Sequence, residues 1–487
     1  MKNKIHSVQY NFIMNFLLTA TNFIFPLVTF PYVTRILLAE GTGAVSFATS
    51  VANYFAMVAS LGIPTYGIRA CAKVRDNKAE LTKTAHEIFI INAVMTAVSV
   101  LAFVLSIYLV PQFREENMLF YINGIGILLN LFGMNWLYQA LEQYDYITIR
   151  SVAAKVISVV LMFALVHQKS DYVIYGAIGV FAAAGSNVLN LIRARHYISF
   201  RPQRGYQFRQ HIKPILTLFA QSVVVSIYTN LDTVMLGFMR DNAEVGLYTT
   251  AVKVKTILLS LVSSLGSVLL PRMSHIVKQG DREQFNNLTK KALDVTLLMA
   301  VPLSIYFCLF ARDSVLLLAG EGFLGAVLAM QIITIALIPN GLTGVLGVQV
   351  LTSLEKEKYV LYSVIVGAVA DLVLNMMFIP AYGAAGAAFA TMIAEFLVLF
   401  VQLYYTRKIV GSMLRHLRAP IYALATAIGA VLSWLVMGSV GAMSPFVSLC
   451  ISATIFFGAY GVVLLVCKEP LLMQYTEKIL SAVKRRK

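Results

Sequence analysis

Long apolar stretches alternate with short polar segments along the whole chain. A helix needs about 20 apolar residues to cross the hydrocarbon core of a bilayer. Stretches of that kind lie near residues 12–36, 43–66, 84–110, 118–140, 149–167, 172–194, 213–239, 246–270, 292–311, 325–351, 358–379, 382–405, 420–437 and 445–466. The pattern therefore predicts an all-α integral membrane protein with about fourteen transmembrane helices.

The most informative stretch is residues 22–75, in which two apolar helices are joined by a turn at Glu40–Gly43 and lead into a basic loop. The first helix contains Pro26 and Pro31. Proline leaves backbone carbonyl groups without a donor, which membranes tolerate mainly where a helix is buried in protein or lines a cavity. We therefore expect this hairpin to line a cavity, with Arg35 near its mouth.

The basic residues are distributed unequally between the two sides of the membrane. Loops on the side of the two termini carry 31 of the 39 Lys and Arg residues. The opposite loops carry only Arg114, Lys169, Arg240 and Arg312. Because cytoplasmic loops are enriched in Lys and Arg, both termini are predicted to be cytoplasmic.

Composition excludes most other classes of protein. Hydrophobic residues make up 59% of the chain and charged residues 13%, whereas soluble domains are about a quarter charged. The net charge of +16 follows from the loop bias, so we expect no nucleic-acid partner. The four cysteines lack metal-binding spacing, and there is no phosphate loop, HExxH motif or nucleophile elbow. We expect a protein that is not an enzyme and that has no cofactor or metal.

An internal repeat sets the expected domain organisation. Several short matches share an offset of about 203 to 207 residues: Tyr175–Gly179 with Tyr382–Gly386, Leu81–Lys83 with Leu288–Lys290, and Gly43 with Gly246. That offset equals six helices, so the halves have the same orientation, as in transporters built from parallel repeats around a cleft. The expected parts are two six-helix halves, two additional helices and a basic tail, at residues 1–212, 213–408, 409–466 and 467–487.

The run FPYVTRILLAEGTGAVSFATS at residues 30–50, followed by Ser-Leu-Gly-Ile-Pro and a basic loop, resembles the Wzx-type polysaccharide repeat-unit flippases. These belong to the multidrug/oligosaccharidyl-lipid/polysaccharide exporter superfamily. The resemblance implies a MATE-like fold in a prokaryotic plasma membrane. It implies transfer of undecaprenyl-pyrophosphate-linked oligosaccharide to the outer leaflet by alternating access, for O-antigen or capsule. A proton or sodium gradient is the implied energy source. The two extra C-terminal helices are a departure shared with peptidoglycan-lipid flippases.

Cations inside the predicted spans are candidates for binding a pyrophosphate, because a charge in the bilayer costs on the order of 3 kcal/mol. They are Arg35, Lys253 and Lys255. The alternative for Arg35 is a side chain that reaches the outer interface. The two lysines are about 200° apart on a helix, so only one, favoured as Lys253, faces a cavity unless the helix is unwound. Asp232 is expected at the same depth as Lys253, either in a structural salt bridge or in one that opens during transport.

Asp371 and Glu395 are the other carboxylates well inside spans. They are candidates for ion coupling, since desolvation favours proton binding by buried carboxylates; the alternative is a neutral acid hydrogen-bonded between helices. Glu87 and Asp294 lie near cytoplasmic ends and are expected to be solvated.

Polar and aromatic residues in three spans are candidates for a glycan path: Asn22, Asn53, Asn135, Trp136 and Gln139. Interhelical hydrogen bonding is the simpler explanation for them. The tail from Leu471 to Lys487 is predicted to form a basic interfacial helix held by anionic lipids.

The leading hypothesis is a flippase for lipid-linked oligosaccharide, working as a monomer beside polysaccharide polymerase or glycosyltransferase machinery. A drug antiporter or a peptidoglycan-lipid flippase on the same fold is the alternative. A membrane-embedded polymerase or ligase is disfavoured, because the outward loops are short and the longest contains no histidine.

Overall fold

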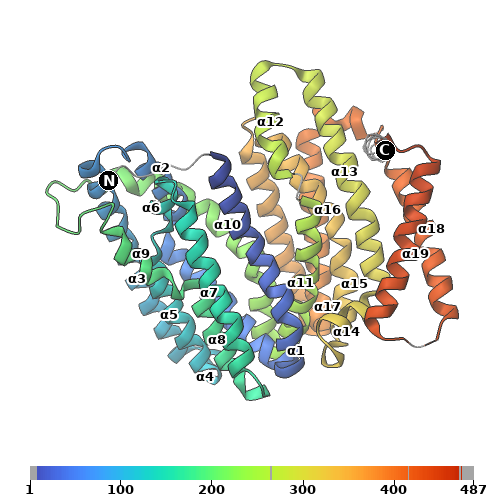
Figure 1. Cartoon of the computed structure of the whole chain (residues 1–487), viewed down its shortest axis with the longest axis horizontal. Coiled ribbons are helices and arrows are strands. Elements are labelled where there is room, and N and C mark those ends of the chain that lie inside the picture. Colours follow the sequence, from blue (N-terminus) through green and yellow to red (C-terminus); the bar gives the residue numbers. More distant parts are fainter. Residues whose placement is uncertain (1–7, 264–265, 415, 442, 471–472, 474–487) are drawn as a thin grey trace, which may run out of the picture. The chain divides into compact units, whose positions relative to one another are not determined.

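The computed structural model describes the chain except for residues 1–7, 264–265, 415, 442, 471–472 and 474–487, and each element in the described part is a helix (Figure 1). The chain divides into two compact units, Met1–Thr249 and Thr250–Lys487. The prediction of an all-α membrane protein is confirmed.

The first unit is a bundle arranged around its longest helix. That helix, α1, contacts α3, α5, α7, α8 and α10. The helices, in chain order, are α1 (Val8–Ser60), α2 (Ile63–Lys73), α3 (Lys78–Leu109), α4 (Pro111–Glu115), α5 (Asn117–Gly133), α6 (Asn135–Ala140), α7 (Tyr144–Leu165), η1 (Lys169–Asp171), α8 (Tyr172–Val180), η2 (Phe181–Gly185), α9 (Asn187–Ala194), α10 (Arg209–Met239) and α11 (Asn242–Ser263), whose second half belongs to the second unit.

In the second unit, α13 packs against α15, α16 and α18, and α17 packs against α15 and α16, while α18 and α19 form a hairpin. Its helices are α12 (Gly266–Gln279), α13 (Arg282–Leu309), α14 (Ala311–Leu318), η3 (Glu321–Phe323), α15 (Ala326–Ile335), α16 (Leu337–Thr343), η4 (Gly344–Leu351), α17 (Glu357–Leu414), α18 (Ala419–Ser439) and α19 (Pro445–Val466).

Twelve helices in the described part of the chain are long and apolar enough to cross a membrane. Two of them, Phe25–Lys73 and Glu357–Gly411, have 49 and 55 residues, which at 1.5 Å per residue is more than twice the roughly 30 Å of a hydrocarbon core. Each contains a break, at Leu38 with φ 56° and at Gly383 with φ 52°. The protein is therefore a multi-pass membrane protein, and the number fourteen stays a prediction.

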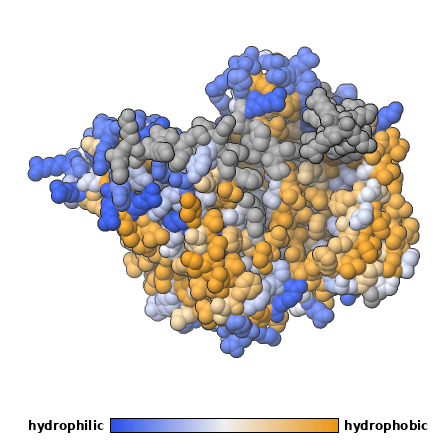
Figure 2. All heavy atoms as spheres, in the orientation of Figure 1, coloured by the Kyte–Doolittle hydropathy of each residue, from blue (hydrophilic) through white to orange (hydrophobic). Residues whose placement is uncertain are grey.

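The outer surfaces of the helices fit this environment. Large apolar side chains such as Leu101, Leu109 and Val466 are 71%, 69% and 76% exposed. Figure 2 shows such residues, in orange, over the middle of the helices, and hydrophilic residues, in blue, gathered near helix ends and loops. An apolar solvent around the middle of the helices removes the cost of this exposure.

Three local expectations are wrong. The first turn lies at Leu38 rather than at Glu40–Gly43. The segment expected as a basic loop after Pro64 is largely the helix α2, because Gly62 adopts the left-handed conformation that starts it and the proline occupies its first turn. Asp294 is buried rather than solvated, and its carboxylate accepts a hydrogen bond from the backbone N–H of Arg418. The predicted tail helix falls mostly outside the described residues.

Candidate functional site

Arg35 lies on an exposed side of α1, just before the break at Leu38. Its Nη1 atom donates a hydrogen bond of 2.6 Å to the carbonyl oxygen of Pro31. This bond holds the guanidinium beside the proline-containing part of the helix. The charge therefore sits next to the hairpin turn, and its place at the mouth of a cavity stays a prediction.

Lys253 and Lys255 lie on a continuous helix, since α11 runs from Asn242 to Ser263 without a break. Successive residues are rotated by about 100°, so the two ammonium groups point away from each other. Both side chains are partly buried. An unwound helix, the condition under which both would face one cavity, does not occur at these positions.

The three intramembrane carboxylates are all buried, with exposed fractions of 7% for Asp232, 1% for Asp371 and 6% for Glu395. Asp232, on α10, accepts a hydrogen bond from the hydroxyl group of Tyr248 on α11. The other two lie in α17 on opposite sides of the break at Gly383. A pair between Asp232 and Lys253 stays a prediction, while the tyrosine hydroxyl is a partner that sequence reasoning missed.

Two candidates for the glycan path contact other helices. The Oδ1 atom of Asn135 accepts hydrogen bonds of 3.1 Å from Nη2 of Arg150 and from Nδ2 of Asn190. The buried ring of Trp136 lies against Gly67 of α2, where a Cβ atom would come within 2.8 Å of the indole. The contacts of Asn135 are interhelical hydrogen bonds, whereas Trp136 packs against α2, and a role of either residue in a glycan path stays a prediction.

The remaining candidates for the glycan path are Asn53, Gln139 and Asn22. Asn53 is exposed and donates a hydrogen bond of 3.3 Å to Oδ1 of Asn230 on α10. Gln139 is partly buried at the end of α6. Asn22 lies in α1, and its side chain is outside the described part of the structure.

The two glycines that the repeat aligns lie against each other's hairpins. A Cβ atom on Gly43 would lie 1.6 Å from the carbonyl oxygen of Asn242, and one on Gly246 would lie 2.0 Å from that of Ala39. The two glycines are 203 positions apart, and each one meets the carbonyl of the residue four positions before the other. The contact is therefore reciprocal, as a pseudo-two-fold axis requires, and both positions require the absence of a side chain.

A carboxylate close to this contact ties three segments together. The Oε2 atom of Glu116 accepts a hydrogen bond of 3.0 Å from the hydroxyl of Tyr172, and Oε1 accepts one of 3.1 Å from Nδ2 of Asn242. Burial raises the pKa of Glu116 above its ordinary value of 4.5, and the charges of Glu115 and Glu40 add to this, while the two hydrogen bonds oppose it.

This raised pKa predicts a pH dependence of stability. The folded protein holds the proton of Glu116 more tightly than the unfolded chain does. The stabilisation of the fold that comes from this proton is therefore complete below the unfolded pKa, and it is lost as the pH rises through the folded pKa. Glu116→Gln is neutral throughout. We expect the melting temperature of this variant minus that of the parent to increase from about pH 4 to about pH 7. A difference that is flat or that falls with pH would contradict the assignment.

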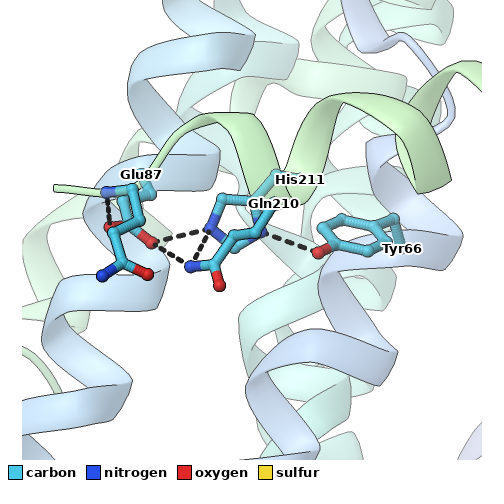
Figure 3. A network of polar contacts seen from close by, with 5 residues as sticks. Tyr66, Glu87, Gln210 and His211 are labelled. Carbon is cyan, nitrogen blue, oxygen red and sulfur yellow. Dashed lines mark hydrogen bonds and ion pairs between the residues drawn. The ribbon is translucent and has the colours of Figure 1, made fainter.

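A second polar network lies where the ends of α2, α3 and α10 meet (Figure 3). His211 is buried between Glu87 and Tyr66, with 2.7 Å from Nε2 to the carboxylate Oε2 and 2.7 Å from Nδ1 to the hydroxyl oxygen. Gln210 donates to the same Oε2 at 3.3 Å, and the backbone N–H of Gln207 donates to Oε1 at 2.6 Å. The expectation that Glu87 is solvated is therefore wrong, because three donors from the chain after α9 cover it.

Beside this network is a pocket of about 600 Å³. Its polar lining comes from α2, α3 and the first turns of α10: Tyr66, Arg69, Lys73, Thr84, Gln210, His211 and Thr217. None of the described residues that line it is a carboxylate. The pocket therefore carries two cations and several donors without a compensating acid.

From the sequence, Arg69 and Lys73 are expected only as loop charges, and His211 is not among the candidate residues. A signal was present, since Tyr66, Arg69 and Lys73 follow the i, i+3, i+7 spacing of one helix face. The polar composition of that stretch concealed it, because α2 is too polar to read as a span.

Comparison with known proteins agrees with this architecture. The chain is 24% identical over 408 residues to a protein of Escherichia coli (strain K12) named "Putative O-antigen transporter", which covers 83% of this chain and 98% of the relative. A solved structure of the lipid II flippase MurJ in an inward closed conformation superposes with a TM-score of 0.73 and 14% identity, over 95% of this chain and 99% of that chain. An inward-facing multidrug resistance MATE family transporter gives 0.58 at 12% identity, over 80% and 96%. At such identities the two structures show the shared fold.

Two family models match the sequence. The MatE model matches residues 218–377. The model described as "Polysaccharide biosynthesis protein" matches residues 8–277, which is more than half of the chain. The resemblance found in the first hairpin is confirmed, and the chain belongs to the polysaccharide biosynthesis protein family.

Proposed function

We propose that this protein carries lipid-linked oligosaccharide repeat units from the cytoplasmic to the outer leaflet of a prokaryotic plasma membrane, for the assembly of a surface polysaccharide such as O-antigen or capsule. The observation that carries the proposal is the family match over residues 8–277. It is supported by the relative named as an O-antigen transporter, which aligns over 98% of its length. The MurJ-like and MATE-like fold provides the architecture of a transporter.

The finer proposal is that the cargo is an undecaprenyl-pyrophosphate ester and that transport follows alternating access. A pyrophosphate that leaves water requires cations, and guanidinium pairs with phosphate oxygens in a fixed fork. Arg35 in α1 and one of Lys253 and Lys255 in α11 are the cations proposed for this role. We assign the exchange of protons or sodium ions to Asp232, Asp371 and Glu395. A charged carboxylate that is buried away from water is unfavourable, and binding a proton or a sodium ion offsets that cost.

A small-molecule antiporter is the second candidate, and the MatE match over residues 218–377 is the observation that favours it. The charge of the candidate binding residues distinguishes the antiporter from the flippase. Exporters of cationic drugs need acidic or aromatic cavities, whereas cations at Arg35 and Lys253 favour an anionic cargo. Peptidoglycan lipid also carries a pyrophosphate, so the MurJ-like fold keeps that cargo as a variant of the same proposal.

Arg35 gives a specific test of the cargo. We expect Arg35→Ala to abolish delivery of surface polymer in cells that depend on this protein, and Arg35→Lys to keep part of it, because lysine supplies the charge without the fork. The measurement is the amount of surface polymer at matched protein levels. Arg114→Ala, which removes an exposed charge from the short helix α4, is the control expected to behave as the parent. Full activity of Arg35→Ala would retire the pyrophosphate role.

A further inference from the structure

The pocket beside the His211 network has an uncompensated charge. Arg69 and Lys73 are both exposed and lie four residues apart on α2. Within the part of the chain that the structure describes, neither side chain forms a hydrogen bond or an ion pair. Like charges at this spacing repel each other. An anion placed between the two side chains would remove that repulsion.

The polar side chains beside the two cations are held in place. Tyr66 precedes Arg69 by one turn on the same face, and its hydroxyl is fixed by the imidazole of His211 at 2.7 Å. His211 is in turn fixed by Glu87, which lies behind it and does not line the pocket. Side chains that are locked by a second layer of hydrogen bonds are preorganised for binding. The pocket thus combines two exposed cations with polar side chains that hydrogen bonds hold in place.

The size and place of the pocket restrict the ligand. A volume of about 600 Å³ admits a phosphorylated headgroup. The pocket lies at the ends of α2, α3 and α10 on the side that the Lys and Arg distribution assigns to the cytoplasm. Headgroups of the inner leaflet reach this level. Phosphate and pyrophosphate esters have the acceptor-only oxygens that two cations and a hydroxyl would bind.

We propose that the pocket formed by Tyr66, Arg69, Lys73 and His211 binds the pyrophosphate ester of a lipid-linked substrate at the cytoplasmic side, before the substrate crosses the membrane. Arg35, Lys253 and Lys255 are not among the residues that line this pocket, and its assignment to substrate rests on the proposed function. Bilayer lipids such as phosphatidylglycerol share the phosphate chemistry, so the experiment must separate the two sources.

The test is equilibrium binding of labelled farnesyl pyrophosphate to the purified full-length protein in phosphatidylcholine nanodiscs. We expect Arg69→Ala/Lys73→Ala to weaken binding about tenfold or more, and Tyr66→Phe, which keeps the ring, to weaken it several-fold. The matched control is Arg209→Ala/Lys213→Ala. This pair has the same spacing on α10 and lines an adjacent surface whose other residues are Ile212, Leu216 and Thr217. We expect it to change binding less than about threefold.

Equal weakening of binding by both double variants would mean that the ligand is attracted by positive charge in general, and this result would overturn the site.

Nanodiscs that contain phosphatidylglycerol provide the second arm. Loss of farnesyl pyrophosphate binding in them would assign the pocket to a bilayer lipid and overturn the substrate role. Melting temperatures identify any variant that fails to fold, in which case Lys73→Gln replaces the double variant. Binding without any flipping by the parent would refute the proposed function and leave the site, whereas flipping with unchanged binding in Arg69→Ala/Lys73→Ala would refute only the site.

Discussion

Gly43→Ala and Gly246→Ala are each expected to destabilise the protein by several kcal/mol and to stop transport. Each new methyl group would lie within 2.0 Å of a backbone carbonyl oxygen on the facing hairpin. Overpacking costs about 1–3 kcal/mol where side chains can adjust, and more where they cannot. Because the obstacle here is backbone, α1 and the α10–α11 turn must separate. The measurements are the melting temperature and delivery of surface polymer.

Gly179→Ala in α8 is the matched control, since a Cβ atom there would meet no atom within 4 Å. In a helix this exchange is neutral or stabilising by up to about 1 kcal/mol. The contact is reciprocal, so the double variant Gly43→Ala/Gly246→Ala should cost less than the sum of the single variants, because the first separation relieves the second clash. Additive effects would show that the two glycines belong to independent contacts.

The second large effect is expected at Glu87. This carboxylate is 1% exposed and accepts three hydrogen bonds, from His211, Gln210 and the backbone of Gln207. Each buried donor left without its acceptor costs about 1–3 kcal/mol. We expect Glu87→Ala to reach that range and Glu87→Gln to cost less, because the amide oxygen still accepts one bond. Denaturant or thermal unfolding measures both.

Glu80→Ala supplies the comparison for Glu87. Glu80 lies on the same helix, α3, and is exposed. Its removal is expected to change stability by less than about 0.5 kcal/mol. If Glu87→Ala were as mild as Glu80→Ala, the network in Figure 3 would not be formed in the protein.

The apolar helices could be predicted because a membrane span is decided by the residues of that span alone. The last two helices were expected at 420–437 and 445–466 and occur at Ala419–Ser439 and Pro445–Val466. The break at Leu38 was displaced from the expected turn because a non-glycine residue adopts the positive φ angle there, and residue type favours Gly41 or Gly43.

The polar sites could not be predicted to the same extent, because their partners are distant in the sequence. Glu87 and His211 are 124 residues apart, and no local pattern relates them. The repeat identified Gly43 and Gly246 as equivalent, yet equivalence under a two-fold axis does not imply contact unless the residues lie near that axis. Arg69 and Lys73 were assigned to a loop because α2, with 11 residues, is too short and too polar to be recognised as a membrane span.

The measurement that bears most directly on the account is translocation of a lipid-linked oligosaccharide in proteoliposomes, read as accessibility of the sugar on the far leaflet. It should be run with the parent and with Lys253→Ala, with and without an imposed proton or sodium gradient. We expect flipping by the parent that depends on a gradient and is lost in Lys253→Ala. Absence of flipping, together with gradient-driven efflux of a small cationic dye, would contradict it and make the protein a drug antiporter.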